Sequence, residues 1–251
     1  MPENTGKSVL ISPLCWGLGH ATRIIPFIRA FQKENCRISI LASREIIGYL
    51  QERFPELEYH EDKSVCFRYK RGMGFFSFIT AGLKFYRKYK KEQQAVRRLL
   101  RKKHFDIIVS DNRYGIWNTK SRNILITHQI KPFVNGFLKL FKNRMHRYIE
   151  KKLENFDHVW IPDYPDHLLS GSLSKLPNES EKYKCIGILS RFEKKILPSN
   201  KLKYYYLIIT SGPREHRINM TDFFIRKNVN REENVKIIGE TDLKSIPENI
   251  E

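Results

Sequence analysis

The sequence predicts an α/β fold built on a doubly wound, mostly parallel sheet. Short apolar runs typical of buried strands alternate along the chain with longer amphipathic stretches typical of helices. Polar clusters also follow directly on several of the apolar runs. The expected strands are residues 8–14, 37–42, 57–60, 106–110, 123–127, 158–161 and 183–187. The expected helices are residues 22–33, 44–53, 75–103 and 133–155.

The turn after the first expected strand is rich in glycine and carries a histidine. Gly17, Gly19 and His20 lie between an apolar strand and a helix start, where glycines let the backbone approach a ligand and free N–H groups face it. The histidine can act near neutral pH as a base or as a hydrogen-bond donor. A tight turn with a purely structural histidine is the alternative. The third glycine of a dinucleotide-binding loop is missing, which argues against a nicotinamide cofactor.

Three polar clusters are expected to share one edge of the sheet. They are residues 17–23, 111–115 and 127–129, each placed at the carboxyl end of an expected strand. Ligands of doubly wound sheets bind beyond that edge. We therefore expect one common site there. For Asp111 the structural alternative is a local Asx turn, and for Arg23 it is a surface charge.

The charge of the chain indicates an anionic partner. It carries 46 Lys and Arg against 27 Asp and Glu, a formal net charge of +19. Ten of these cations and one glutamate lie in residues 84–103, next to several aromatic residues, and residues 133–155 show a similar pattern. Such basic, aromatic-rich helices suit an anionic membrane surface. Packing of both helices on the sheet is the alternative. Nucleic acid is a remote alternative, because no nucleic-acid-binding module is recognisable.

The remaining bulk features are consistent with a cytoplasmic protein bound peripherally to the inner face of the plasma membrane. The polar amino terminus does not resemble a signal peptide, and the apolar residues 72–83 are too few to span a bilayer. The four cysteines show no metal-type or disulfide-type spacing, which fits a reducing compartment.

The chain is expected to contain two domains. Residues 1–188 form the first, and the polar, basic residues 189–203 form a linker. Residues 204–251 provide only a strand at 204–210, a helix at about 215–227 and a strand at 235–238, too few to bury much surface alone. We expect this second α/β domain to be truncated, either because the chain is a fragment or because another polypeptide completes it.

Five segments carry a family resemblance. They are GLGHATRIIP (17–26), DIIVSD (106–111), ILITHQ (124–129), IGILSR (186–191) and LIITSGP (207–213). In their order and spacing they resemble the MurG-like branch of glycosyltransferase family 28, which has the two-domain GT-B fold. The resemblance implies inverting transfer of a sugar from a nucleotide-sugar co-substrate, with a UDP-sugar expected, to a lipid-linked or cell-envelope glycan acceptor. It implies no tightly held cofactor and no metal.

The resemblance also assigns roles. The first domain would hold the acceptor, and the second would hold the donor, with most of the donor pocket beyond Glu251. His20 and Asp111 are expected to be catalytic, His20 as the base or as a group that positions the acceptor, and Asp111 as a group that orients the base or binds sugar hydroxyls. Substrate contacts are expected from Gly17, Gly19, Arg23, Asn112, Arg113, His128 and Gln129, and contacts to the donor diphosphate from Ser211 and Gly212. The alternative function is a non-catalytic acceptor-binding, membrane-recruiting half that needs a separate donor-binding subunit.

Overall fold

The computed structural model divides into two compact units, Met1–Glu193 and Lys194–Glu251. We call them unit 1 and unit 2 and describe each by itself. The structure describes residues 6–16, 18–63, 76–128, 130, 142–174, 180–192, 206–211, 214–228, 234–243 and 245.

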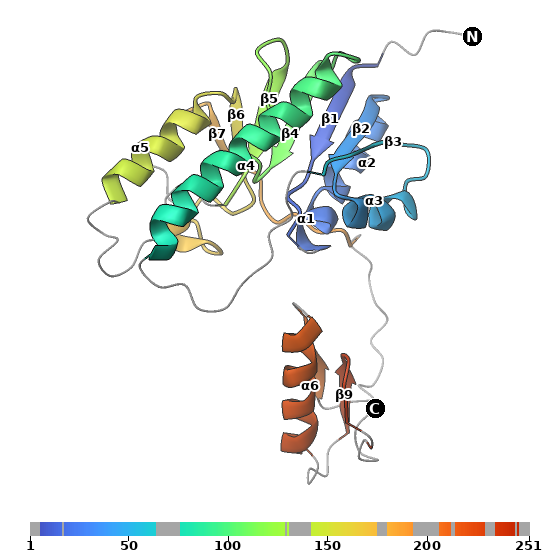
Figure 1. Ribbon diagram of the computed structural model, residues 1–251. Helices are drawn as coiled ribbons and strands as arrows, with labels where there is room; N and C mark the ends of the chain where they lie inside the picture. The colour runs from blue at the N-terminus through green and yellow to red at the C-terminus, as the bar shows by residue number, and fades with distance from the viewer. Residues whose placement is uncertain are drawn as a thin grey trace. The chain divides into compact units, whose positions relative to one another are not determined.

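Unit 1 is built on a seven-stranded, fully parallel sheet in the order β3-β2-β1-β4-β5-β6-β7 (Figure 1). The strands at the centre are apolar and buried, as expected for a parallel sheet covered on both faces. The strands are β1 (Ser8–Ser12), β2 (Arg37–Ala42), β3 (Glu58–Glu61), β4 (Ile107–Asp111), β5 (Arg122–Ile126), β6 (His158–Ile161) and β7 (Tyr183–Cys185). All seven expected strands are confirmed.

Helices cover both faces of this sheet. The helices on one face are α1 (Leu18–Arg23), α2 (Ile25–Lys33) and α3 (Arg44–Gln51), and those on the other are α4 (Phe76–Leu100) and α5 (Lys142–Leu153) (Figure 1). Successive side chains of β1 point to opposite faces of the sheet and therefore pack into two different cores. Val9 packs in the cluster that contains residues of α2 and α3, whereas Leu10 packs with Val96 and Leu99 of α4. This alternation follows from the two-residue period of a strand.

The first expected helix differs from the observed one. The chain forms two short helices there, because Ile24 adopts a turn before Pro26, which has no N–H group for an intrahelical bond. The first of them, α1, already starts at Leu18, so His20 lies on a helix and not on the predicted loop. Of the expected helix 133–155, residues 133–141 lie outside the described residues, and the observed helix α5 ends at Leu153.

The loop after β4 packs tightly against α4 at Gly115. Its N–H group donates to Glu92 Oε2 at 3.0 Å, and its carbonyl accepts from Gln93 Nε2 at 2.7 Å. A Cβ atom at Gly115 would lie 2.6 Å from both the Tyr89 carbonyl oxygen and Glu92 Cβ. The helix backbone therefore leaves no room for a side chain at this position.

Gly115→Ala is expected to destabilise the protein by about 1–3 kcal/mol, because the added methyl group must push α4 away from the loop. Urea unfolding followed by circular dichroism measures this loss. Gly48→Ala is the matched control. Gly48 lies within α3 with nothing within 4 Å of its added Cβ, so that change should stabilise by about 0.5–1 kcal/mol. Equal effects at both positions would contradict the packing described.

Unit 2 contains two parallel strands, β8 (Tyr206–Ile209) and β9 (Val235–Ile238), joined through helix α6 (Arg214–Asn228). The expected strand–helix–strand order is therefore confirmed. Ile225 and Val235 form a small core with the helix-facing side chains of both strands. Within the described residues of both units, no helix has the length and apolar character needed to cross a bilayer.

Candidate functional site

The strand order places the predicted polar clusters at a topological switch point. From β1 the chain first builds outward to β2 and β3, and then crosses to β4 on the other side of β1. The connection that follows β1 and the connection that follows β4 lead to opposite sides of the sheet. This leaves a crevice between the carboxyl ends of β1 and β4, where folds of this kind bind ligands. His20 follows β1, Asp111 ends β4, and His128 follows β5. The structure thus brings three predicted residues to one edge.

His20 and Asp111 form the central contact of this edge. His20 Nδ1 lies 2.7 Å from Asp111 Oδ2, although the two residues are 91 positions apart in sequence. Asp111 is completely buried, and His20 is 9% exposed. A buried carboxylate beside an imidazole fixes the orientation of the ring, which is the arrangement that positions a histidine base.

Arg23 completes the cluster from the last turn of α1. Its Nη2 atom lies 3.3 Å from Asp111 Oδ1 and 2.6 Å from His20 Nδ1, and its Nη1 atom lies 3.4 Å from His128 Nδ1. The guanidinium therefore offsets the buried negative charge of Asp111. The sequence left open whether Arg23 is only a surface charge. The structure places it in the cluster with His20 and Asp111.

The Asp111 carboxylate and the Arg23 guanidinium compete for Nδ1 of His20. Arg23 can only donate hydrogen bonds, so Nδ1 of His20 cannot satisfy both of its close neighbours at once. A proton on Nδ1 bonds to the Asp111 anion, whereas a bare Nδ1 would place its lone pair against that anion. The electrostatics therefore favour the Nδ1–H tautomer, which leaves Nε2 of the neutral ring unprotonated and able to accept a proton.

A pocket of about 300 Å³ lies beside the cluster. Arg23 and His128 line one part of it, and the rest is lined by Pro162, Leu169, Ser170, Ile188 and Leu189. Burial, with the nearby Arg23 charge, lowers the pKa of His128, so its ring is neutral at pH 7. The pocket thus presents one guanidinium and one neutral imidazole next to an apolar wall.

Asp163, which sequence reasoning missed, shapes the pocket wall. Its fully buried carboxylate accepts backbone N–H bonds from Tyr164 (2.7 Å), Leu169 (3.1 Å) and Ser170 (2.9 Å), and a hydroxyl bond from Ser170. Burial favours the neutral acid, but these hydrogen bonds prevail and hold the Asp163 pKa far below its usual range. Two of the bonded residues, Leu169 and Ser170, line the pocket. The available signal was the position of Asp163, two residues after the end of β6.

Asp163→Asn is expected to destabilise unit 1 by about 1–3 kcal/mol, because an amide N–H₂ group replaces one acceptor oxygen. Since the folded pKa is lowered, the contribution of Asp163 to stability is present above its unfolded pKa of about 3.9 and is lost as the pH falls below that value. Thermal unfolding between about pH 3 and pH 7 measures both effects. Asp166→Asn, at an exposed position of the same loop, should change little. An unchanged acid dependence in Asp163→Asn would contradict this account.

Arg113 requires a correction. It was expected to contact substrate, but it is only 4% exposed and lies within the fold. Its guanidinium binds Asp62, reaches Glu92 Oε1 at 3.3 Å and donates to Ser12 Oγ at 2.8 Å. These contacts tie the loop after β4 to β1, to α4 and to the end of β3. Arg113 is therefore a positioning residue, and nothing in the sequence around it indicated its two buried carboxylate partners.

The other predicted residues are placed as follows. Asn112 has a positive φ of 52° and donates its N–H to the Ile126 carbonyl at 3.0 Å, so it forms the turn behind Asp111. Gly19 lies in α1 with open space around its Cα. Ser211 is exposed in unit 2. Gly17, Gln129 and Gly212 lie outside the described residues.

The cysteines depart in part from the sequence expectation. Cys15 is disulfide-bonded, whereas Cys36 and Cys185 are free. In the part of the chain that the structure describes, no group of three His, Cys, Asp or Glu side chains could hold a metal ion.

Comparison with known proteins identifies the fold. No protein-family model and no curated protein matches the sequence. Among solved structures, the calicheamicin glycosyltransferase CalG4 matches with a TM-score of 0.64 at 12% identity, over 98% of this chain and 70% of that one. The Streptomyces sp. SF2575 glycosyltransferase SsfS6, complexed with thymidine diphosphate, matches with a TM-score of 0.57 at 12% identity, over 97% and 70%.

The Acinetobacter baumannii MurG structure matches less closely, with a TM-score of 0.49 at 12% identity over 92% of this chain and 60% of that one. This value is too low to support the narrower MurG-like assignment, which stays a prediction. The expected fold class is confirmed: the chain has an α/β architecture with a seven-stranded parallel sheet, and it is similar to glycosyltransferases of the GT-B fold.

Proposed function

We propose that this chain is the acceptor-side part of a glycosyltransferase that uses a nucleotide-sugar donor. The observation that carries the proposal is the His20–Asp111 contact of 2.7 Å at the switch point of the sheet. It provides an oriented base in a crevice, beside a pocket that can receive an acceptor. The GT-B fold of the solved neighbours supports the same reaction class.

The proposed reaction is an inverting displacement. An acceptor hydroxyl oxygen forms a bond to the anomeric carbon, while the bond from that carbon to the donor diphosphate breaks and the nucleoside diphosphate leaves with the electron pair. Nε2 of His20 takes the hydroxyl proton, and Asp111 stabilises the imidazolium that results. Attack opposite the leaving group inverts the anomeric configuration.

The pocket suits an acceptor with an apolar portion. Four of its lining side chains are apolar, Pro162, Leu169, Ile188 and Leu189. This agrees with the expectation of a lipid-linked or envelope glycan acceptor. For the donor we keep the expectation of a UDP-sugar, and the thymidine diphosphate bound to SsfS6 supports a nucleoside diphosphate more generally.

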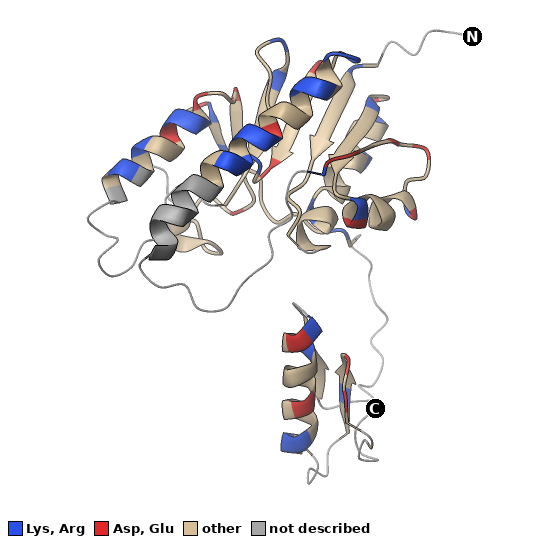
Figure 2. Cartoon of the chain, in the orientation of Figure 1, with Lys and Arg blue, Asp and Glu red and all other residues tan. Residues whose placement is uncertain are grey.

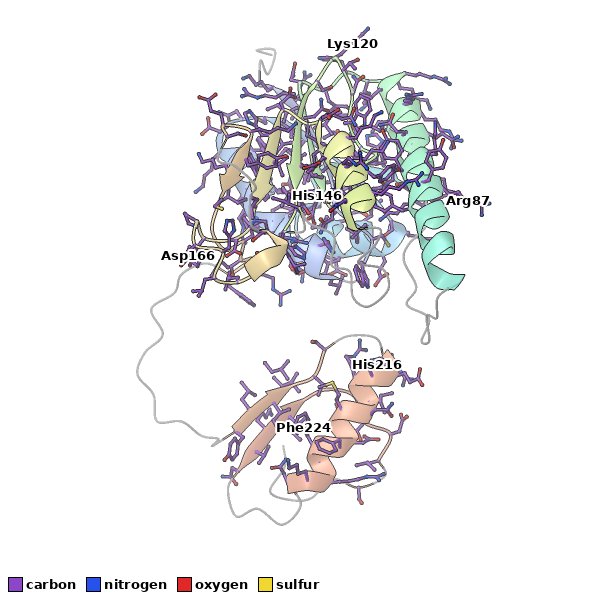
Figure 3. All side chains as sticks on the ribbon, turned by 90° about the vertical axis from the view of Figure 1, so that its left-hand side faces the viewer. Arg87, Lys120, His146, Asp166, His216 and Phe224 are labelled. Carbon is purple, nitrogen blue, oxygen red and sulfur yellow. The ribbon has the colours of Figure 1, made fainter. Side chains whose placement is uncertain are left out.

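The exposed faces of α4 and α5 support contact with an anionic membrane. Figure 2 shows basic residues along the described parts of α4 and α5. Arg87 and Lys90 are exposed on α4, and Arg87 projects away from the sheet (Figure 3). Arg144, Arg147 and Lys151 are exposed on α5. Each such cation near an anionic leaflet contributes about 1 kcal/mol. We propose peripheral binding at the cytoplasmic face of the plasma membrane. The side chains of the expected aromatic cluster at 75–83 lie outside those described, and Phe85 packs against Tyr114 and Tyr148.

A second candidate function is an acceptor-binding half that acts with a separate donor-binding subunit. Unit 2 supports it, because its described residues supply only β8, α6 and β9. Leu207, Ile209 and Ile238 are each at least half exposed on this pair of strands. Such apolar side chains become buried when further elements complete the sheet.

The test is release of nucleoside diphosphate. The full chain, alone and with any protein that co-purifies with it, is mixed with UDP- or TDP-sugars and vesicles that contain lipid-linked acceptors. Release by the chain alone supports transfer by this chain itself, and release only with the co-purified protein supports an acceptor-binding half that a separate donor-binding subunit completes. Asp111→Asn should reduce the rate about 10²-fold or more, whereas Asp166→Asn should not. No release in any combination, or full activity of Asp111→Asn, would overturn the proposal.

A further inference from the structure

A second, larger cleft lies on the face of the sheet that carries α4. Its volume is about 740 Å³. Leu41 of β2 lines it together with Ala95 and Leu99 of α4, which gives it an apolar lining. It shares no lining residue with the 300 Å³ pocket beside His128.

The polar lining of this cleft is mainly cationic. The lysines and arginines lie just after β3, along one stripe of α4 and in the turn that follows α4. His60, Glu61, Asp62 and Gln94 also line the cleft. The cations are Lys63, Lys91, Arg98, Lys102 and Lys103. Arg98 and Lys102 are four residues apart, and Lys91 lies two turns before Arg98. Like charges at this spacing repel one another along a helix face.

Most of these cations have no ion-pair partner in the part of the chain that the structure describes. Among the described residues, Lys63, Lys91, Arg98 and Lys102 form no ion pair, whereas Lys103 pairs with Glu58. The two carboxylates that line the cleft do not neutralise these cations. Asp62 is already bound by Arg113, and Glu61 is exposed at the end of β3. The cleft therefore keeps a net positive charge that a bound anion would neutralise.

We infer that this cleft is a binding site for a compact ligand that carries two or more phosphate charges. A guanidinium fork and several ammonium groups around one volume are the donors that phosphate oxygens prefer. The apolar lining would contact the body of the same ligand. This site lies apart from the proposed transfer site, and Asp62 lines it while also holding Arg113, two residues after Asp111. A ligand in the cleft would therefore contact Asp62, which belongs to the ion-pair network that holds the loop after β4.

Pyrophosphate is the probe, and isothermal titration calorimetry of the full chain is the measurement. The double variant Arg98→Gln/Lys102→Gln is expected to bind pyrophosphate at least about tenfold more weakly than the original chain. The matched control is Arg97→Gln/Arg101→Gln, which removes the same charge at the same spacing from exposed positions that do not line the cleft. This control should change the affinity by less than about twofold. Thermal unfolding confirms that both variants are folded.

Three results would overturn the inference. They are no binding of pyrophosphate by the original chain, equal weakening in both double variants, and full binding by Arg98→Gln/Lys102→Gln. Equal weakening would indicate a general effect of net charge. None of these outcomes depends on sugar transfer, so the inference and the proposed function fail separately.

The phosphate could belong to a soluble molecule or to a lipid headgroup, and vesicles distinguish the two. If the site binds a headgroup, sedimentation with vesicles that contain phosphatidic acid should weaken in Arg98→Gln/Lys102→Gln more than in the control. Pyrophosphate should then compete for the vesicles. If it binds a soluble ligand, the two variants should sediment alike while pyrophosphate binding still differs between them. Both patterns support the site and identify the source.

Discussion

His20→Ala is expected to reduce kcat for sugar transfer by about 10²- to 10⁴-fold while KM for the acceptor changes little. The loss falls on kcat because Nε2 acts on the acceptor proton only as the new bond forms. His20 is also not one of the residues that line the 300 Å³ pocket that would hold the acceptor. Steady-state kinetics in the nucleoside diphosphate assay separate the two constants.

His104→Ala is the matched control for this prediction. His104 Nε2 lies 3.5 Å from Asp106 Oδ1, so it also pairs with an aspartate, but the side chain is 62% exposed and precedes β4 at the opposite edge of the sheet. Its replacement should leave both constants unchanged. A His20→Ala enzyme that keeps its kcat and loses only acceptor affinity would show that His20 binds the acceptor and does not take its proton.

Arg113→Met is expected to destabilise the protein by about 3–5 kcal/mol, the largest stability effect that we predict. The methionine can fill much of the space, but it leaves the buried Asp62 and Glu92 carboxylates without their guanidinium partner. Lys88, 3.7 Å from Glu92 Oε1, can offset only one of these two charges. Because such a loss is a large part of a typical domain's stability, the variant should be partly unfolded at 37 °C.

Urea unfolding of Arg113→Met and Arg53→Met tests this expectation. Arg53 pairs with Glu52 at 3.4 Å on the surface, where both side chains are well exposed, so its replacement should cost about 0–1 kcal/mol. Equal costs for the two variants would mean that the Arg113 network does not support the fold as we describe.

Much of the fold could be predicted because its signals are local. Apolar runs such as Val9–Ile11 are bounded by turns, and the alternation of strands with long amphipathic stretches favours parallel pairing. The break between α1 and α2 was missed because one amphipathic pattern continues across it. Pro26, which is compatible with the first turn of a helix, is also compatible with the start of a second one.

The prediction of the site succeeded mainly for residues at, or a few positions after, the carboxyl end of a strand. His20, Asp111 and His128 were found in this way, because parallel strands bring their carboxyl ends to one edge. The predicted role of Arg113 was wrong for the same reason, since position after a strand does not tell whether a side chain faces the crevice or the interior. Its partners Asp62 and Glu92 lie 51 and 21 residues away in sequence, and pairing over such distances depends on tertiary packing.

Nitrogen NMR of the His20 imidazole shows whether Asp111 holds the ring with Nε2 free to take a proton. We expect neutral His20 to carry its proton on Nδ1, Nε2 to be unprotonated, and Asp111→Asn to remove this preference. A neutral ring with its proton on Nε2 would contradict the account, because that nitrogen could not then accept a proton from an acceptor hydroxyl.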